Sequence, residues 1–234
     1  MDTKKKLAVL FINLMIIIWT IICVFGFFTD IGDGNMKVIG IECFRYFTID
    51  SNILMALAAL LMIPFTVHSL IKKTDEPKWI ILLNYIGTTA VTVTFLTVML
   101  FLGPTQGYGI MIEGSNLYLH IIGPVLACMS FVFLQPFRLQ KKEILLSVLP
   151  TFVYGTLYLV MVIIVGKNNG GWEDFYGFNL GGFWYLSYVL MNIATFGLGI
   201  CLKLFHNRYV KKSEQVSSVN LSFFGLLDKK MKIC

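Results

Sequence analysis

The chain has 234 residues, of which 57% are hydrophobic and 14% charged, with a net charge of +6 and a mean hydropathy of +0.77. A soluble domain carries about 45–50% apolar and about 25% charged residues, so this composition excludes an ordinary water-soluble fold. Apolar runs of about 20 residues predict membrane-spanning helices instead. The basic residues stand in short clusters between these runs, without a basic stripe or a base-stacking motif, which excludes nucleic acid as a partner.

Six apolar runs predict an all-α, polytopic bundle of six transmembrane helices that makes up one membrane domain, residues 1–205. The predicted spans are about 7–28, 47–70, 79–102, 117–134, 144–165 and 181–205. The first run follows a short basic lead, but it is too long for a signal peptide and has no small-x-small cleavage site, so we predict an uncleaved span. Residues 206–234 form a basic tail, which is either a short amphipathic helix on the inner leaflet or disordered.

The basic residues predict the orientation of the bundle, because cytoplasmic loops are enriched in Lys and Arg. One predicted side holds only Lys37, Arg45 and Lys167. The other side holds the remaining 16 of the 19 basic residues: Lys4, Lys5, Lys6, Lys72, Lys73, Lys78, Arg138, Lys141, Lys142, Lys203, Arg208, Lys211, Lys212, Lys229, Lys230 and Lys232. We therefore predict that both termini are cytoplasmic and that the protein is a multi-pass protein of the cell membrane.

The cysteines show no paired spacing that would indicate a disulfide framework or a zinc site. They are Cys23, Cys43, Cys128, Cys201 and Cys234. Phosphate loops, metal-binding His-Glu-x-x-His helices and Gly-x-Ser-x-Gly elbows do not occur in the sequence either. We therefore expect no metal and no diffusible cofactor.

Polar residues crowd at the head of the second predicted span, where Arg45, Thr48, Asp50, Ser51 and Asn52 adjoin an apolar run. Ionisable and polar groups inside a membrane are costly unless they meet partners or face a wet cavity, so this stretch is a candidate site. The spacing of Arg45, Thr48 and Asn52 predicts one shared helical face. Asp50 is expected to point away from Thr48 and to pair with Arg45 or with another helix.

His120 lies inside a predicted span, near the start of the fourth helix, whereas His68 and His206 fall near the predicted cytoplasmic ends of helices. The second and fourth helices enter from the same face, and at about 1.5 Å per residue Thr48 and His120 differ in depth by only a few ångströms. A hydroxyl beside an imidazole is the minimal arrangement for nucleophilic acyl transfer. The sequence leaves plainer roles open, namely a capping or back-bonded threonine and a histidine hydrogen-bonded to a neighbouring helix.

Other polar and aromatic side chains within the spans have structural explanations. Interhelical hydrogen bonding is the expected role of Asn84, Thr88, Thr92 and Asn192. Five aromatic residues either line a lipid-shaped pocket or serve as interfacial anchors: Tyr154, Tyr158, Trp184, Tyr185 and Tyr188.

Two short motifs resemble the androgen-induced-gene family, which includes the androgen-dependent regulator of tissue factor pathway inhibitor. They are Phe44-Arg45-Tyr46-Phe47-Thr48 and the Asn-x-x-x-His pattern from Asn116 to His120. The resemblance implies six spans and hydrolysis of fatty acid esters of hydroxy fatty acids, with Thr48 as nucleophile and His120 as its partner. The stretch 46–52 is more similar to bacterial six-helix membrane relatives of that family, whose activity is unassigned, and the loop 171–176 matches only loosely.

Together these patterns favour a bacterial membrane hydrolase of lipid esters with an apolar, fatty-acyl substrate drawn from membrane lipids. Thr48 and His120 are the catalytic candidates, Arg45 and Asn52 the substrate-binding candidates, and Asn52, Arg45 or a tyrosine hydroxyl the candidate oxyanion donors. One alternative is a transporter of small solutes or lipids, with Arg45, Asp50, His120 and Asn192 along its pathway. Another is a structural or assembly protein. The oligomeric state stays open.

Overall fold

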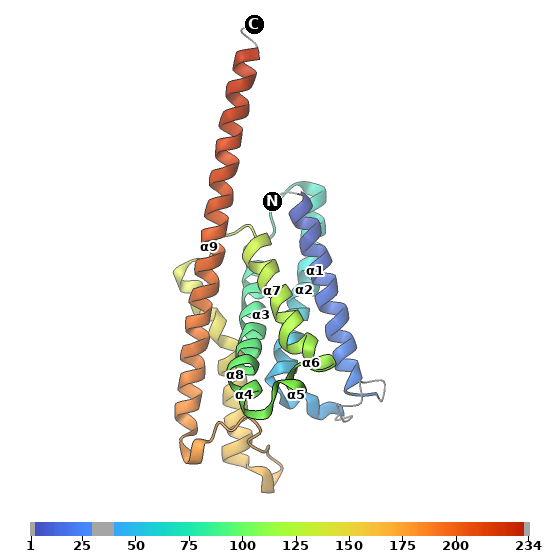
Figure 1. Ribbon diagram of the computed structural model, residues 1–234, viewed down its shortest axis with the longest axis vertical. Coiled ribbons are helices and arrows are strands. Elements are labelled where there is room, and N and C mark those ends of the chain that lie inside the picture. The colour runs from blue at the N-terminus through green and yellow to red at the C-terminus, as the bar shows by residue number, and fades with distance from the viewer. Residues whose placement is uncertain (1–2, 30–39, 232–234) are drawn as a thin grey trace.

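The computed structural model describes residues 3–29 and 40–231, and over that range the chain is helical and contains no strand (Figure 1). Six helices are long and apolar enough to cross a membrane: Thr3–Gly26, Phe47–Lys72, Lys78–Gln106, Ser115–Leu134, Lys141–Val165 and Trp184–Lys212. Each overlaps one of the six predicted spans. The all-α six-helix architecture is therefore confirmed, and the protein is a multi-pass membrane protein.

Three of the spans are composite helices. The first two spans are not composite: they are the single helices α1 (Thr3–Gly26) and α2 (Phe47–Lys72). The 3₁₀ turn η1 (Gly40–Arg45) precedes α2. The third combines α3 (Lys78–Thr97), η2 (Val98–Leu102) and α4 (Gly103–Gln106), and the fourth combines α6 (Ser115–Leu117), η3 (Tyr118–Ile122), α7 (Gly123–Met129) and η4 (Ser130–Leu134). The fifth combines η5 (Lys141–Val148), α8 (Leu149–Leu159) and η6 (Val160–Val165). Short pieces α5 (Tyr108–Ile112), η7 (Lys167–Asn169) and η8 (Leu180–Gly182) connect them.

Two of the composite helices change their winding just before a Gly-Pro pair. The π-helical turn η2 precedes Gly103-Pro104, and the π-helical turn η3 precedes Gly123-Pro124. A proline lacks an amide hydrogen and its ring crowds the carbonyl four residues earlier, so the preceding turn widens. Turns of this kind occur frequently at functional sites, and His120 lies in the middle of η3.

The bundle is packed in three layers of buried side chains, and α3 is the most buried of its spans. The middle layer joins α1, α2, α3 and α7 through Ile16, Met55, Ala59, Val91 and Ala127. Helices in a membrane associate through close van der Waals packing, which small residues permit. Gly87 on α3 serves this purpose, because an added Cβ would lie 3.1 Å from the Met55 backbone of α2.

The lysine-rich connections gather at the end of the bundle that carries the N-terminus (Figure 1). The Lys6 ammonium donates to the carbonyl oxygens of Ser69 and Thr74, which ties α1 to the turn between α2 and α3. Lys78 pairs with Glu143 at 2.6 Å and ties α3 to η5. This clustering at one end agrees with the charge pattern, and cytoplasmic termini stay a prediction. Of the basic residues that carry it, Lys37 and Lys232 lie outside the described residues.

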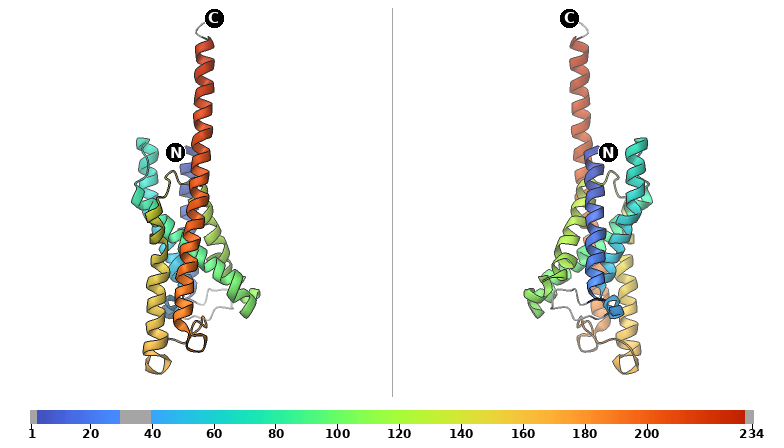
Figure 2. Two further views of the ribbon diagram at one scale, coloured as in Figure 1. Left: turned by 90° about the vertical axis from the view of Figure 1, so that its left-hand side faces the viewer. Right: turned by 90° about the vertical axis from the view of Figure 1, so that its right-hand side faces the viewer.

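The helix of the sixth span continues into the stretch that was predicted as a tail. α9 runs from Trp184 to Met231 as one helix of 48 residues. Its C-terminal part projects beyond the other helices as a single rod (Figure 2). The helix has no break at residue 206, and the division into a membrane domain and a basic tail stays a prediction.

Candidate functional site

The head of α2 is fixed by the extended conformation of Tyr46. This residue precedes the helix with φ −101° and ψ 126°, and its carbonyl accepts the amides of Ile49 and Asp50. Thr48 consequently lies in the first turn of α2. The unpaired amides of a first turn give that end of a helix a partial positive charge.

Thr48 and His120, for which the helical rise had predicted a similar depth, lie next to one another. Thr48 Oγ1 and His120 Nε2 are 3.5 Å apart, across residues separated by 72 positions in the chain. This distance is at the outer limit of a hydrogen bond between the two atoms. Nucleophile–base pairs are often longer in ligand-free enzymes and shorten when substrate binds.

The other ring nitrogen determines which tautomer of His120 faces Thr48. His120 Nδ1 contacts the carbonyl oxygen of Met111, on the short helix α5. A carbonyl can only accept, so in the neutral ring Nδ1 carries the proton and Nε2 presents its lone pair to Thr48. His120, only 6% exposed, is thus oriented as a hydrogen-bond acceptor toward the threonine hydroxyl.

The two polar residues of the Asn-x-x-x-His pattern, Asn116 and His120, have one structural role in common. The Asn116 amide donates to the carbonyl of Ile110 at 3.0 Å, and the next carbonyl along, that of Met111, meets His120. Both polar residues of the pattern therefore attach α5 to the start of the fourth span. Asn116 positions the carbonyl that orients the imidazole.

Asn52 connects the second and fourth spans instead of facing an open site. Its Nδ2 donates to the carbonyls of Thr48 at 2.8 Å and Leu119 at 3.0 Å, so both amide hydrogens are engaged. Gly123 allows this approach, because an added Cβ there would lie 3.2 Å from Asn52 Oδ1. Asn52 thus fixes the backbone on both sides of the Thr48–His120 pair, and its amide has no hydrogen left for an oxyanion.

Arg45 lies outside the helical face that its spacing to Thr48 and Asn52 had predicted. It ends the 3₁₀ turn η1, before α2 begins at Phe47, so the helical spacing does not extend to it. Its guanidinium pairs with Glu42 at 3.1 Å, and both side chains are largely exposed. The prediction of an Arg45–Thr48–Asn52 face is wrong for Arg45, and neither cavity beside Thr48 is lined by this arginine.

The loop between the fifth and sixth spans supplies Tyr176 to the site. The hydroxyl of Tyr176 accepts the Phe47 amide at 3.0 Å and lies within hydrogen-bonding reach of the Thr48 hydroxyl. Burial raises the pKa of Tyr176 to about 12, so the hydroxyl stays protonated at physiological pH.

Asp174 organises this loop. Its carboxylate accepts the Tyr158 hydroxyl at 2.8 Å and the amides of Phe178 and Asn179 at 2.8 and 2.9 Å. The Tyr158 hydroxyl in turn accepts the Tyr176 amide at 3.1 Å. A cluster of stacked aromatic rings packs the loop against the heads of α2 and α8: Tyr46–Phe175, Phe47–Tyr154 and Tyr158–Tyr176, with centroids 4.7, 5.1 and 5.5 Å apart.

Asp174→Ala is expected to lower the free energy of unfolding by about 1–3 kcal/mol, because hydrogen bonds to a charged acceptor contribute on that scale. Thermal unfolding of the purified protein measures the loss. The matched control is Glu173→Ala, since Glu173 is an exposed neighbour that pairs with Lys167 at the surface, where such pairs add little. Equal melting temperatures for the two variants would contradict the role given to Asp174.

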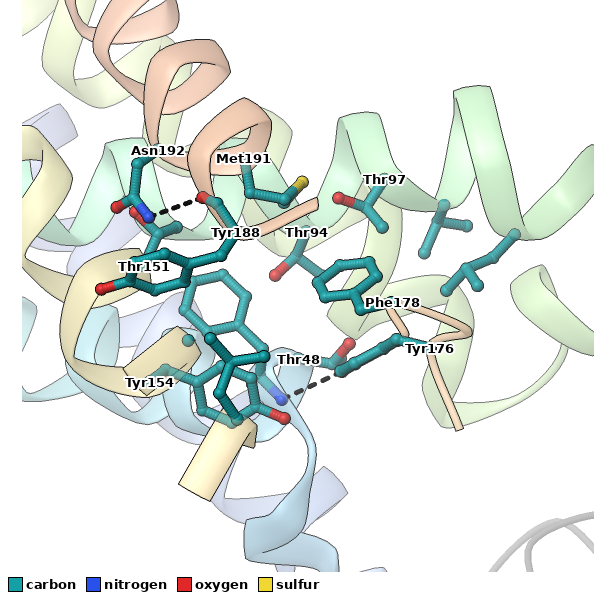
Figure 3. A pocket seen from close by; sticks show the side chains of 15 residues that line it. Thr48, Thr94, Thr97, Thr151, Tyr154, Tyr176, Phe178, Tyr188, Met191 and Asn192 are labelled. Carbon is teal, nitrogen blue, oxygen red and sulfur yellow. Dashed lines mark hydrogen bonds between the residues drawn. The ribbon is translucent and has the colours of Figure 1, made fainter. Parts of the chain in front are cut away.

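Thr48 separates two cavities. The first, of about 320 Å³, contains Thr48 and His120 together with Tyr46, Met111 and Tyr176, and most of its wall is apolar. The second is a tight void of about 50 Å³ on the other side of Thr48, shown in Figure 3, where Tyr176 and Tyr154 lie beside the threonine. Only the first has a volume typical of a ligand site, at the lower end of the range of about 300–1,000 Å³.

The remaining polar and aromatic candidates divide between the two expected roles. Thr92 meets Cys128 Sγ of the fourth span at 3.0 Å, an interhelical contact as predicted, whereas the Asn192 amide donates to Tyr188 in its own helix. Tyr154 and Tyr188 line the tight void, and Tyr185 is exposed.

No cluster of three or more His, Cys, Asp or Glu side chains that could bind a metal ion occurs among the described residues.

Comparison with family models, with curated proteins and with solved structures finds no match to this chain. The resemblance carried by the two short motifs therefore remains an interpretation of the sequence. What the site can do has to be argued from its own geometry.

Two site components were not identifiable from sequence. The carbonyl of Met111 is a backbone group on a connecting helix, and no residue type marks it. Tyr176 lies 129 positions from the amide that it accepts, and tyrosine as a class was only one of three candidate oxyanion donors. Its place in the loop 171–176, next to the acidic pair Glu173 and Asp174, was the one available signal.

Proposed function

We propose that the protein is a membrane-embedded hydrolase of lipid esters in which Thr48 is the nucleophile and His120 the general base. The observation that carries the proposal is the orientation of the imidazole: Nδ1 faces the Met111 carbonyl, and Nε2 faces Thr48 Oγ1 at 3.5 Å. A base aligned by its other nitrogen and aimed at a hydroxyl is the arrangement that activates such a nucleophile.

The reaction would proceed in two halves. His120 Nε2 removes the proton of Thr48 as Oγ1 attacks the ester carbonyl. The protonated imidazole then gives that proton to the departing alkoxide, which leaves an acyl-threonine and a free alcohol. Water, deprotonated by the same nitrogen, attacks the acyl group, and Thr48 recovers its proton from the imidazolium. The products are a fatty acid and an alcohol.

Tyr176 is the oxyanion donor in this proposal. Of the three candidates, the Asn52 amide is fully engaged and Arg45 pairs with Glu42 away from both cavities. The buried Tyr176 hydroxyl adjoins Thr48 and retains its proton at neutral pH. The partial positive charge at the head of α2 acts in the same direction.

Tyr176→Phe is expected to lower kcat by about 10²–10³-fold with little change in KM, because the lost donor acts mainly on the transition state. The phenylalanine ring keeps the aromatic packing, although the Phe47 amide loses its acceptor. Steady-state hydrolysis of a fluorogenic fatty-acyl ester measures both constants. A rise in KM alone would assign Tyr176 to substrate binding.

The substrate class follows from where the site lies. The cavity with Thr48 and His120 has a predominantly apolar wall and lies at the heads of the second and fourth spans. Such a site favours fatty-acyl esters that arrive from the adjacent leaflet, and the predicted orientation makes this the outer leaflet of a cell membrane. The resemblance to the androgen-induced-gene family and to its bacterial relatives points to the same class.

The test is hydrolysis by the purified protein in vesicles, with fatty-acyl esters of different chain length and with a fluorophosphonate probe. We expect turnover of long-chain esters and probe attachment at Thr48, located by mass spectrometry of the labelled peptide. Solute uptake without ester turnover would contradict the proposed hydrolase and favour the alternative of a transporter. Against that alternative, the cavity that contains His120 is not lined by Arg45, Asp50 or Asn192.

A further inference from the structure

A third cavity, larger than the two beside Thr48, lies elsewhere in the bundle, and Thr48 is not among its lining residues. It is a groove of about 580 Å³ between α3, the fourth span and α9. Its wall is apolar along most of its length, including Phe95, Val125 and Leu198. Thr92 lines it as well, but its hydroxyl donates to the Thr88 carbonyl and meets Cys128, so it is already paired.

The groove has the length of one membrane leaflet. Along α9 its lining runs from Leu198 to Arg208 and ends one turn further, at Lys212. The ten residues from Leu198 to Arg208 rise about 15 Å. The hydrocarbon core of a bilayer is about 30 Å thick, so this length is about half of it. A single acyl chain in one leaflet extends over that same depth.

Positive charge is concentrated at one mouth of the groove. Arg208 and Lys212 are exposed and one turn apart on α9, and both line the groove. Between them, the Tyr209 ring carries the Lys5 ammonium 5.3 Å from its centroid. The lining residues include no carboxylate. This mouth is at the end of the bundle where the other basic connections gather.

We propose that this groove is a binding site for an anionic phospholipid, which places one acyl chain along the apolar wall and its phosphate between Arg208 and Lys212. Basic pockets between transmembrane helices on the positively charged side are suited to anionic headgroups. A zwitterionic lipid has a cationic group in its headgroup, which the three cations at this mouth, Arg208, Lys212 and Lys5, would repel. The site is independent of the Thr48–His120 pair and does not rest on the proposed hydrolase.

The experiment is native mass spectrometry of the full-length protein, titrated in detergent with three probes. They are phosphatidylglycerol, phosphatidylcholine with the same acyl chains, and inorganic phosphate. We expect phosphatidylglycerol to bind on the order of tenfold more tightly than phosphatidylcholine, and inorganic phosphate not to displace it at equal concentration. Equal affinity for the two lipids overturns the proposal, and full displacement by phosphate reduces the site to an anion site without a lipid.

One matched pair of variants and one further variant locate the site. Arg208→Gln should remove most of the preference for phosphatidylglycerol, whereas Lys211→Gln should keep it, since Lys211 is an equally exposed neighbour that does not line the groove. Val125→Trp, at a side chain that is 42% exposed and lines the groove, should weaken lipid binding without any change of charge. An unchanged preference in Arg208→Gln, or unchanged affinity in Val125→Trp, overturns the proposal.

Discussion

Thr48→Ala is expected to lower kcat/KM for fatty-acyl ester hydrolysis by at least about 10³-fold and to abolish labelling by a fluorophosphonate. Removing a nucleophile eliminates the covalent route altogether and leaves only what binding and the oxyanion donor contribute. The fold should survive, because the side-chain contacts that Thr48 loses are those with His120 and Tyr176, neither of which joins the helices by itself. Hydrolysis rates and probe labelling of the purified variant measure the effect.

Two further variants give this prediction its control. Thr48→Ser keeps a hydroxyl at the same place and should keep measurable turnover and labelling. Thr97→Ala removes a different hydroxyl that lines the tight void beside Thr48, and it should leave the rate near that of the wild type. Normal ester turnover by Thr48→Ala would eliminate Thr48 as the nucleophile and leave it the capping or packing role that its position also permits.

The spans were predictable because hydropathy alone determines them. Backbone groups inside a bilayer must be hydrogen-bonded within their own segment, so a long apolar run has essentially one solution, the helix. The positions of Thr48 and His120 in their helices further predicted their similar depth, since the helical rise is constant. Their rotation toward one another was not predictable, because it depends on packing between helices distant in sequence.

Arg45 shows where periodicity fails. Its spacing to Thr48 is helical, but the chain turns at Tyr46, so Arg45 belongs to a separate 3₁₀ turn with Glu42 as its partner. A spacing rule assumes that one helix continues across the interval, and helix ends are the least certain part of any sequence-based assignment. At the other end of the chain, α9 continues as a helix past residue 206, and the sequence had left a helical tail as one of two alternatives.

The contacts of the widened turn at His120 could not be predicted from the sequence either. The Gly123-Pro124 pair indicates a change of winding. It does not predict that the preceding turn directs the Leu119 carbonyl to Asn52 and the His120 ring to Thr48. These contacts join residues 67 and 72 positions apart. They exist because the second and fourth spans meet at their heads, which is a property of the whole bundle.

His120→Gln is expected to lower kcat/KM by about 10²–10⁴-fold, the contribution of a positioned general base. In the wild type, kcat/KM should fall as the pH decreases, because a protonated imidazole has no lone pair for the Thr48 proton. The glutamine variant should lose that acid limb along with most of its rate. The pH dependence of hydrolysis separates this role from a purely structural one, which would leave the profile unchanged in shape.

The double variant Thr48→Ala/His120→Gln decides whether the two side chains act as one unit. Residues that carry out a single step are non-additive, so the double variant should be no slower than Thr48→Ala alone. Independent roles would multiply the two losses instead.

His206→Gln is the control for introducing glutamine at a buried histidine: His206 contacts the carbonyls of Val132 and Phe137, away from the site. It should reduce stability while leaving the shape of the pH profile intact, and multiplied losses in the double variant would contradict the Thr48–His120 dyad.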